Sequence, residues 1–294
     1  MSKIVKYEYL HNNKIIFYDD NKKIFIKNKK RYDLDKVYTY LDNHGIDNYL
    51  KPLRITDREI YFDYLDSLKL DKDEMAKRLI YNLSIWQNKT TIYRKIDKDK
   101  LKEEYDKYNN KINYLENYYY TLQDMIESKV YMSSCEYLFI RNVSIIYKAL
   151  NYSKNVLEEW YKLSLNETKE RYVMCHGKCQ LEHFISSEKD YFISLEKAHI
   201  GRVSEDFIYF YNHHYDEIEM ESSFRFYQHR YRYRKIEMLY LTFNLLMLDK
   251  IDIYPSSLDK SIELSTYFEK LDYTFLFVSE YQKDNHHNKE YEFN

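Results

Sequence analysis

Residues 172–212, YVMCHGKCQLEHFISSEKDYFISLEKAHIGRVSEDFIYFYN, decide the fold of this 294-residue chain. An apolar entry leads to a tight Cys175-His176-Gly177 turn, and two short apolar runs follow at residues 184–186 and 191–194. A polar turn separates the two runs, and an aromatic helix begins near Asp206. The periodicity therefore predicts strand, turn and strand, followed by a loop and a helix.

The order and spacing of these residues resemble the aminoglycoside-phosphotransferase and choline-kinase branch of the kinase-like fold. In that branch the region reads His-Gly-Asp, four residues, Asn, a hairpin and Asp, and a buried Asp later begins a helix. His176, Gly177 and Asp206 match the scaffold positions of this pattern. The likeness extends to spore-coat kinase-like proteins, because residues 196–201 resemble a segment that recurs in them and Glu237 matches a further position.

At the catalytic-base and metal-binding positions of the same pattern, this chain has residues that differ from those of the family. Lys178 occupies the catalytic-base position, His183 the metal-binding Asn position and Ser194 the metal-binding Asp position. Phosphoryl transfer needs a carboxylate that orients the hydroxyl and oxygen ligands that hold Mg²⁺. A lysine ammonium accepts no proton at neutral pH unless its pKa is strongly lowered, and imidazole is a poor Mg²⁺ ligand. Glu196 is the one nearby carboxylate that could reach a metal, so the pattern resembles a degenerate active site.

The resemblance implies a two-lobed, protein-kinase-like α+β fold with a small β-rich N-lobe and a large helical C-lobe. We expect the N-lobe, made of antiparallel strands plus one helix, at residues 1–66. The C-lobe, with the degenerate catalytic hairpin, is expected at residues 67–281, and residues 282–294 are predicted as a polar tail. A chain of this length can form two lobes with substantial cores.

Short apolar segments in the first 66 residues predict the N-lobe strands. The expected order is three strands, one helix and two strands, at residues 4–10, 14–18, 23–27, 34–43, 49–55 and 59–64. By the resemblance, Lys27 occupies the position of a phosphate-pairing lysine and is a candidate nucleotide-binding residue. Because Lys29 and Lys30 follow, the alternative interpretation is a lysine-rich strand edge. Residues 1–44 contain no glycine, so no glycine-rich phosphate loop is present.

Beyond residue 66 the periodicity is mainly helical. We expect helices at residues 72–89, 98–127, 137–150, 156–163, 206–215, 224–248 and 257–271, followed by an aromatic stretch at 273–281. The long segment 98–127 carries tyrosine and aliphatic side chains at intervals of three and four residues. We interpret it as an amphipathic helix packed on the C-lobe rather than as an inserted arm for a partner.

The composition indicates a tyrosine-rich chain, with 36 tyrosines, and a mixed-charge surface of formal net charge −2. A net charge this close to zero does not indicate nucleic-acid binding by the chain as a whole. No stretch approaches the roughly 18–20 apolar residues of a membrane span, and no signal peptide is recognisable. The three cysteines are an odd number and predict no disulfide framework. We therefore expect a cytoplasmic protein, associated with the spore coat if that resemblance holds.

Two local patterns suggest other ligands. Cys175, Cys179 and His183 are spaced by four residues, but structural zinc sites favour closer cysteine pairs and a fourth ligand. We expect no metal site and interpret both cysteines as apolar filling. Residues 225–235, RFYQHRYRYRK, interleave cations with aromatic rings as single-strand nucleic-acid grooves do. Because an acidic run precedes them, we prefer a solvated helix start or a patch for an acidic partner.

These observations lead to two functional hypotheses. The first is a catalytically inactive kinase-like protein, a pseudokinase, that binds protein partners and uses no cofactor. In this hypothesis Lys178 pairs with Glu196 or Glu182 where metal and phosphate would otherwise lie. The second is an atypical phosphotransferase that uses ATP and Mg²⁺ on a small-molecule substrate. Glu196 would then be the metal ligand, and a carboxylate such as Glu182 would be the base.

Overall fold

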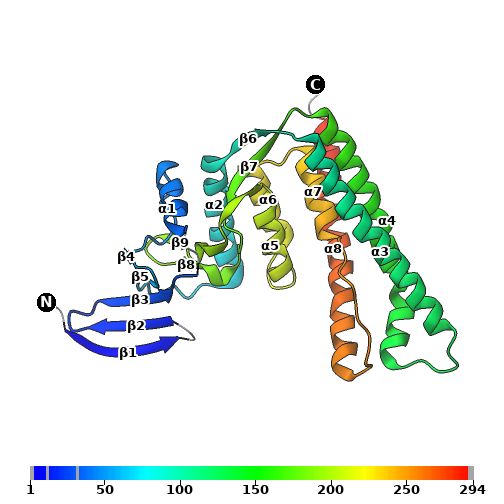
Figure 1. Cartoon of the computed structure of the whole chain (residues 1–294), viewed down its shortest axis with the longest axis horizontal. Coiled ribbons are helices and arrows are strands. Elements are labelled where there is room, and N and C mark those ends of the chain that lie inside the picture. Colours follow the sequence, from blue (N-terminus) through cyan, green and yellow to red (C-terminus); the bar gives the residue numbers. More distant parts are fainter. Residues whose placement is uncertain (1–2, 11–12, 31–32, 291–294) are drawn as a thin grey trace. The chain divides into compact units, whose positions relative to one another are not determined.

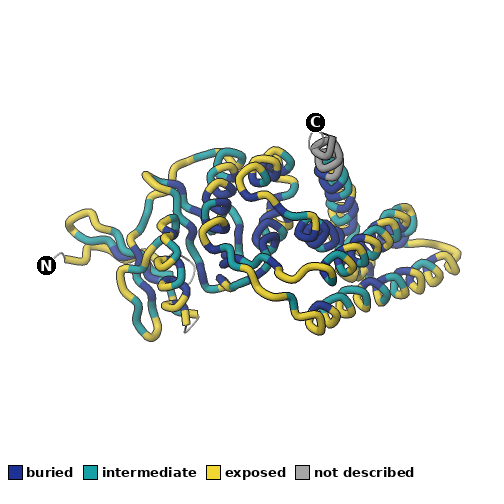
Figure 2. The backbone as a smooth tube through the Cα atoms, turned by 90° about the horizontal axis from the view of Figure 1, so that it is seen from above, coloured by how far each residue is buried: buried dark blue, intermediate teal, exposed yellow. Residues whose placement is uncertain are grey.

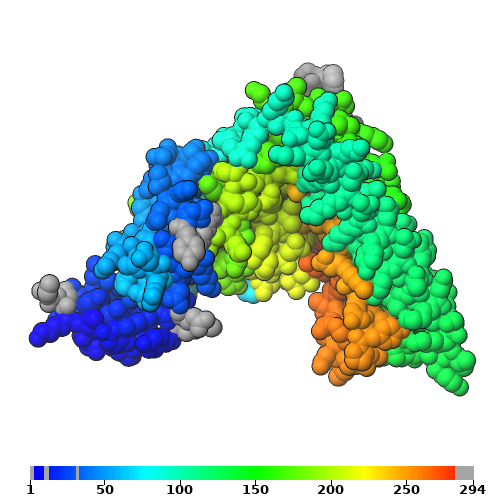
Figure 3. All heavy atoms as spheres, in the orientation of Figure 1, coloured from blue at the N-terminus to red at the C-terminus, as the bar shows by residue number. Residues whose placement is uncertain are grey.

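The computed structural model describes residues 3–10, 13–30 and 33–290. These residues divide into two compact units (Figure 1). The first unit contains the chain up to Ile92 together with Arg171–Arg232, and Figure 3 shows the blue N-terminal residues and the yellow-green segment that belong to it. The second unit contains Tyr93–Glu170 and the chain from Tyr233 onward. The sequence predicted an N-lobe that ends at residue 66 and a C-lobe that ends at residue 281. The division into compact units does not test these lobe boundaries, so they stay predictions.

A five-stranded antiparallel sheet begins the first unit (Figure 1). Its strands are β1 (Ile4–Leu10), β2 (Asn13–Tyr18), β3 (Lys23–Asn28), β4 (Arg54–Ile55) and β5 (Glu59–Asp63). Their order in the sheet is β1-β2-β3-β5-β4. Asn21 adopts a φ of 61° in the turn between β2 and β3, a conformation that asparagine tolerates better than most residues. The predicted order of three strands, one helix and two strands is confirmed.

Helix α1 (Leu34–Asn43) is the helix predicted among these strands. Its buried residues are Leu34, Val37, Tyr38 and Leu41. Gly45 follows the helix with a φ of 63°, a left-handed conformation that glycine adopts without steric cost. The predicted strand at residues 49–55 is wrong except for its last two residues, which form β4. Pro52 explains the difference, because it has no amide hydrogen to contribute to a strand ladder.

Helix α2 (Lys72–Thr90) begins after Asp71, whose side chain accepts a hydrogen bond from the amide of Glu74. Its fully buried apolar residues are Ala76, Leu79, Ile80, Leu83 and Trp86. The indole nitrogen of Trp86 donates a hydrogen bond of 2.5 Å to the carbonyl oxygen of Met174. This bond connects α2 to the strand that enters residues 172–212.

Residues 172–212 form short elements around a tight turn. They are β7 (Lys169–Cys175), the 3₁₀ turn η1 (Leu181–His183), β8 (Phe184–Ser186), β9 (Asp190–Phe192), the 3₁₀ turn η2 (Leu195–Lys197), β10 (His199–Arg202) and α5 (Glu205–His214). Strands β8 and β9 pair antiparallel, which confirms the predicted hairpin. Strand β10 pairs antiparallel with β7, and this pairing was not predicted. Strand β6 (Ile92–Lys95) was not predicted either.

The segment at residues 224–248 is not one helix, as predicted, but parts of two. Helix α6 spans Met220–Arg230 and helix α7 spans Lys235–Leu245. Arg234 is extended, and its amide donates a hydrogen bond of 2.7 Å to the carboxylate of Glu237. Because this contact satisfies an amide at the helix start, it favours a new helix over continuation of the previous one.

The second unit is predominantly helical within the described residues, with most of β6 and the start of β7 as its strand residues. It contains α3 (Lys98–Glu127), α4 (Ser134–Asn166), α7 and α8 (Leu258–Glu290). Helix α4 packs against α3, α7 and α8, and Figure 2 shows buried residues recurring along these helices. No helix in the described ranges has the length and apolar character needed to cross a membrane.

Two helices in this unit are longer than the sequence predicted. Residues 137–150 and 156–163 belong to one helix, α4, because the polar residues between them include neither glycine nor proline. Helix α8 continues past residue 271 and through the aromatic stretch to Glu290, so it includes most of the predicted tail. The last four tail residues lie outside the described ranges.

Candidate functional site

A cavity of about 230 Å³ opens in the first unit beside β3 and the β8–β9 hairpin. Its apolar lining residues are Phe25, Leu50, Phe62, Leu65, Ile185, Ile193 and Leu195. Its charged and hydroxyl-bearing lining residues are Lys27, Tyr38, Asp63, Tyr64, Ser194 and Glu196. Mostly apolar walls with a few convergent polar groups are the usual composition of a ligand pocket.

Lys27 reaches this cavity from β3. Its ammonium nitrogen lies 3.0 Å from Oγ of Ser194 and 2.5 Å from Oε1 of Glu196. The two side chains of the ion pair are largely buried, with 17% and 15% of their surface exposed. Burial acts to raise the pKa of Glu196, but the hydrogen bond and charge of Lys27 outweigh burial and lower that pKa. The predicted site residues Lys27, Ser194 and Glu196 therefore form one contact.

The backbone at Ser194 shapes this contact. Ser194 has a φ of 66° and a ψ of 50°, the left-handed conformation that few residues other than glycine adopt. The chain consequently turns sharply after β9, and Glu196 lies in η2 instead of continuing along the strand. The turn places a hydroxyl and a carboxylate on the same ammonium group.

The second part of the site is the His176-Gly177 turn. The buried Asp206 carboxylate accepts hydrogen bonds from the amides of His176, at 2.8 Å, and Gly177, at 2.9 Å. Burial raises the pKa of Asp206 to about 6, although both amide bonds act to lower it. Gly177 has a φ of 76°, and a Cβ there would lie 2.3 Å from the carbonyl oxygen of Lys197. The three predicted scaffold residues meet in this turn.

The imidazole of His176 connects the turn to the end of the hairpin. Its Nε2 lies 2.8 Å from the carbonyl oxygen of Ile193, and its Nδ1 accepts a 3.2 Å hydrogen bond from the amide of Lys178. Burial lowers the pKa of His176 to about 4. The ring is therefore neutral at pH 7, with its hydrogen on Nε2, and it holds the loop in place.

The imidazole of His183 contacts the backbone of Lys178. The carbonyl oxygen of Lys178 lies 2.9 Å from Nδ1 of His183, and burial lowers the pKa of that imidazole. The predicted ion pair of Lys178 with Glu196 or Glu182 is wrong, since Glu196 pairs with Lys27 and the described residues include no ion pair of Lys178. The Glu182 side chain is 67% exposed and lies 3.8 Å from the imidazole of His214.

The structure gathers the cysteine, histidine and carboxylate groups differently from the sequence pattern. Among the described residues, the metal-ligating atoms near Cys175 are those of His199 and Glu205, rather than those of Cys179 and His183. Residues 225–235 turn part of their aromatic surface inward, because Tyr227 and Tyr231 are buried. The guanidinium of Arg230 lies 4.1 Å from the ring centre of Tyr81.

Sequence reasoning missed Tyr38 as a site residue. The sequence predicted only a helix at residues 34–43, whereas the structure places Tyr38 of that helix in the cavity wall. Burial and the nearby charge of Glu196 raise the pKa of Tyr38. A tyrosine within an otherwise aliphatic stripe is the only signal that the sequence carries for this position.

Comparisons with known proteins bear on the fold. No protein-family model matches the chain, and no curated protein matches it in sequence. An aminoglycoside phosphotransferase from Alicyclobacillus acidocaldarius matches with a TM-score of 0.70 at 10% identity, over 97% of this chain and 93% of that one. The AMP-bound spectinomycin phosphotransferase APH(9)-Ia matches with a TM-score of 0.54 at 14% identity, over 92% of this chain and 93% of that one.

The same spectinomycin phosphotransferase in complex with ADP and spectinomycin has a TM-score of 0.50 at 13% identity, over 94% of this chain and 92% of that one. At identities this low, the structural matches establish only a shared fold. The function has to be argued from the residues of the site. The chain has the kinase-like fold of the aminoglycoside phosphotransferases, and the predicted fold class is confirmed.

Proposed function

We propose that this chain is a catalytically inactive kinase-like protein that acts by binding other proteins. The observation that carries the proposal is the contact of Lys27 with Ser194 and Glu196. In the kinase-like fold, a lysine on this strand pairs with nucleotide phosphates. Here the same lysine is paired with Glu196, which follows the degenerate metal-binding position Ser194, so the cation and the carboxylate neutralise each other in the wall of the cavity.

The base position supports the same proposal. Lys178 stands where a carboxylate would orient the substrate hydroxyl, and a protonated amine cannot take up the proton. Removing a positioned base typically lowers a rate by about 10²–10⁴-fold. Glu182, the carboxylate considered as a substitute, is exposed and lies beside His214.

The donor set does not fit the Mg²⁺ that kinase-like enzymes use. Ser194 offers a neutral hydroxyl that already accepts a hydrogen bond from Lys27, and His183 offers an imidazole. Mg²⁺ prefers carboxylate and water oxygens in an octahedral arrangement. Glu196, the carboxylate that the sequence pattern offers as a metal ligand, is bound to an ammonium at 2.5 Å. We therefore propose that the chain uses no cofactor.

The proposal extends to location and partner. The three cysteines are free and buried, which fits the reducing cytoplasm. The resemblance of residues 196–201 to spore-coat kinase-like proteins makes a coat protein the first partner to test. The alternative, an atypical small-molecule phosphotransferase with Glu196 as metal ligand, requires Glu196 to exchange Lys27 for a metal.

A phosphate-transfer assay tests the proposal. Purified protein is incubated with ATP and Mg²⁺ or Mn²⁺, with panels of small-molecule alcohols and proteins as acceptors. We expect no transfer and no phosphate release above a preparation made from cells without the gene. Turnover that is present in the natural chain and absent in Glu196→Gln would contradict the proposal and support the alternative.

A further inference from the structure

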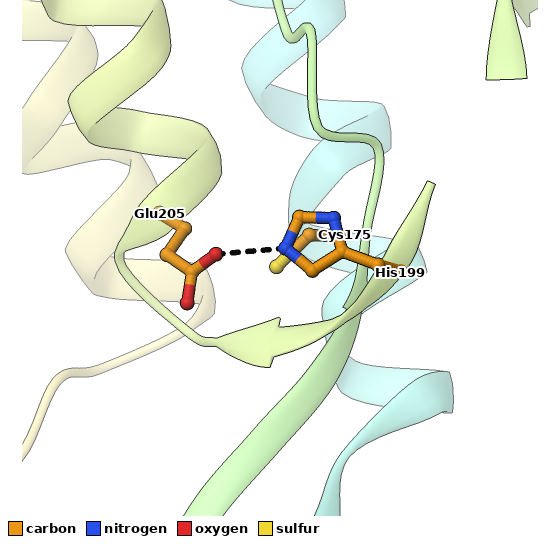
Figure 4. A group of neighbouring side chains, drawn as sticks. All are labelled: Cys175, His199 and Glu205. Atoms are coloured by element: carbon orange, nitrogen blue, oxygen red, sulfur yellow. Dashed lines mark hydrogen bonds and ion pairs between the residues drawn. The ribbon is translucent and has the colours of Figure 1, made fainter. Parts of the chain in front are cut away.

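The side chains of Cys175, His199 and Glu205 converge in the first unit, outside the cavity (Figure 4). One potential ligand atom from each residue lies within 4.8 Å of the other two. Cys175 and His199 are direct partners across the antiparallel pair β7–β10, so their side chains lie on one face of that pair. Glu205 comes from the first turn of α5. We propose that these three residues bind one zinc ion.

Two hydrogen bonds orient the ligand atoms. Nδ1 of His199 lies 2.8 Å from the carbonyl oxygen of Lys197, which directs Nε2 toward Glu205. Metal-binding histidines characteristically donate their second ring N–H in this way. Oε1 of Glu205 accepts a 2.7 Å hydrogen bond from the amide of Arg202, which leaves Oε2 facing His199. Each side chain is thus fixed by a hydrogen bond to the backbone, and Nε2 of His199 and Oε2 of Glu205 point toward each other (Figure 4).

Gly201 leaves space between the carboxylate of Glu205 and the thiol of Cys175. A Cβ on Gly201 would lie 2.6 Å from Oε2 of Glu205 and 2.9 Å from the sulfur of Cys175. Any side chain at residue 201 would therefore intrude between the carboxylate and the thiol. The chain has only three glycines, and unlike Gly45 and Gly177 this one does not have a left-handed backbone. Space beside the ligand atoms, rather than backbone conformation, accounts for a glycine here.

The chemistry of the three ligands selects zinc. Thiolate, imidazole and carboxylate are all zinc ligands, with bonds of about 2.0–2.3 Å, and tetrahedral coordination places ligand atoms roughly 3–4 Å apart. The observed group needs small side-chain movements to reach that geometry. Thiolate and imidazole select against Mg²⁺ and Ca²⁺, which prefer oxygen ligands. With three protein ligands and a half-exposed histidine, the fourth position is taken by water.

Zinc binding replaces two protons. The thiol of Cys175 loses its proton to solvent, and the proton between Nε2 of His199 and Oε2 of Glu205, 2.9 Å apart, also leaves. One thiolate and one carboxylate then balance the two charges of the ion. The site joins β7, β10 and α5 beside His176 and Asp206, so bound zinc stabilises the turn that these residues form.

The test uses the untagged full chain, stripped of metal with a chelator and then titrated with Zn²⁺ or Co²⁺. We expect one equivalent of zinc to bind and to raise the melting temperature. Cobalt should give the visible spectrum of a tetrahedral site and a sulfur-to-cobalt charge-transfer band. Cys175→Ser should abolish that band, and His199→Gln and Glu205→Gln should weaken zinc binding by at least about 10–100-fold.

Matched controls separate this site from others. Cys179→Ser changes an equally buried thiol and His183→Gln a nearby imidazole, and both variants should keep the cobalt band. Because Cys175→Ser removes a buried group, the variant at the half-exposed His199 keeps the test decisive if that protein fails to fold. Absence of a charge-transfer band in the natural chain, or its persistence in His199→Gln at unchanged affinity, would overturn the proposal. So would its loss in Cys179→Ser or His183→Gln.

Discussion

The ammonium nitrogen of Lys27 lies 2.5 Å from Oε1 of Glu196, and both side chains line the same cavity. One residue comes from the third strand of the sheet and the other from the 3₁₀ turn after the β8–β9 hairpin. The pair places opposite charges where the kinase-like fold handles phosphate, and the proposed loss of activity rests on it.

Replacing Lys27 with alanine should destabilise the protein. Glu196 would keep a largely buried carboxylate without its cation, which costs about 1–3 kcal/mol of unfolding free energy at pH 7. Lys23→Ala is the matched control, because Lys23 lies on the same strand as Lys27, pairs with the exposed Asp66 and should lose less than about 1 kcal/mol. Urea unfolding measures both, and equal losses would contradict a special role for the buried pair.

The cost of Lys27→Ala should depend on pH. Lys27 holds the pKa of Glu196 below its usual value, so the stabilisation is present above the unfolded pKa of about 4.3. It is lost as the pH falls through the lower pKa of the folded state. The difference in stability between the natural chain and Lys27→Ala should therefore shrink toward pH 3, and a difference that grows on acidification would refute this account.

Gly177→Ala should cost far more than Gly45→Ala. Both glycines have positive φ, so alanine at either position meets a backbone cost of roughly 1–2 kcal/mol. Only at Gly177 would the new Cβ also collide with a carbonyl oxygen, whereas nothing lies within 4 Å at Gly45. Thermal unfolding of the two variants compares them directly, and similar melting temperatures would show that the Gly177 turn is not constrained as described.

Two histidines should titrate at opposite ends of the pH range. Burial lowers the pKa of His176 to about 4, while the hydrogen bond to Glu205 raises the pKa of His199 to about 9. NMR spectra of the imidazole nitrogens in metal-free protein should show these titrations, and His176→Gln and His199→Gln assign the signals. A His176 that protonates near pH 6.5 would mean that its ring is exposed to water.

Asp206→Ala should remove the acceptor of two buried amides and cost roughly 2–5 kcal/mol. Burial raises the pKa of Asp206 to about 6, above its unfolded value of about 3.9, so Asp206 favours the folded state most when protonated. Its contribution is full below about pH 4 and decreases as the pH rises through 6. The loss in Asp206→Ala should therefore be larger at pH 4 than at pH 7.

The exposed Asp57 provides the control for this experiment. Asp57→Ala should change stability by less than about 0.5 kcal/mol at either pH. Unfolding in urea at pH 4 and pH 7 measures all three proteins. A cost of Asp206→Ala that is independent of pH, or larger at pH 7, would contradict the buried, weakly acidic carboxyl described here.

The sequence predicted the parts of the fold that depend on local signals. Strand and turn residues near the N-terminus and around His176-Gly177 identified the elements, and the β8–β9 hairpin is confirmed. Helix lengths were less predictable, because residues 151–155 look polar yet lie inside α4. The break before α7 depends on a side-chain contact of Glu237 that periodicity does not reveal.

The candidate site was only partly predictable. Lys27, Ser194 and Glu196 were each identified, but Glu196 was assigned to Lys178, because the sequence does not say which of many lysines a distant carboxylate meets. The grouping of His199 with Cys175 was missed because it depends on the register of β10 against β7. Register is fixed by packing across strands, and spacing along the chain does not contain it.

The most direct test of the central claim is calorimetric titration of the purified protein with ATP, in the presence and absence of Mg²⁺. If the Lys27–Glu196 pair replaces the phosphate and metal contacts, Mg²⁺ should not increase the affinity for ATP, and Glu196→Gln should behave as the natural chain does in this respect. An affinity for ATP that rises about tenfold or more with Mg²⁺, which corresponds to roughly 1.4 kcal/mol, and that loses this increase in Glu196→Gln would contradict the claim.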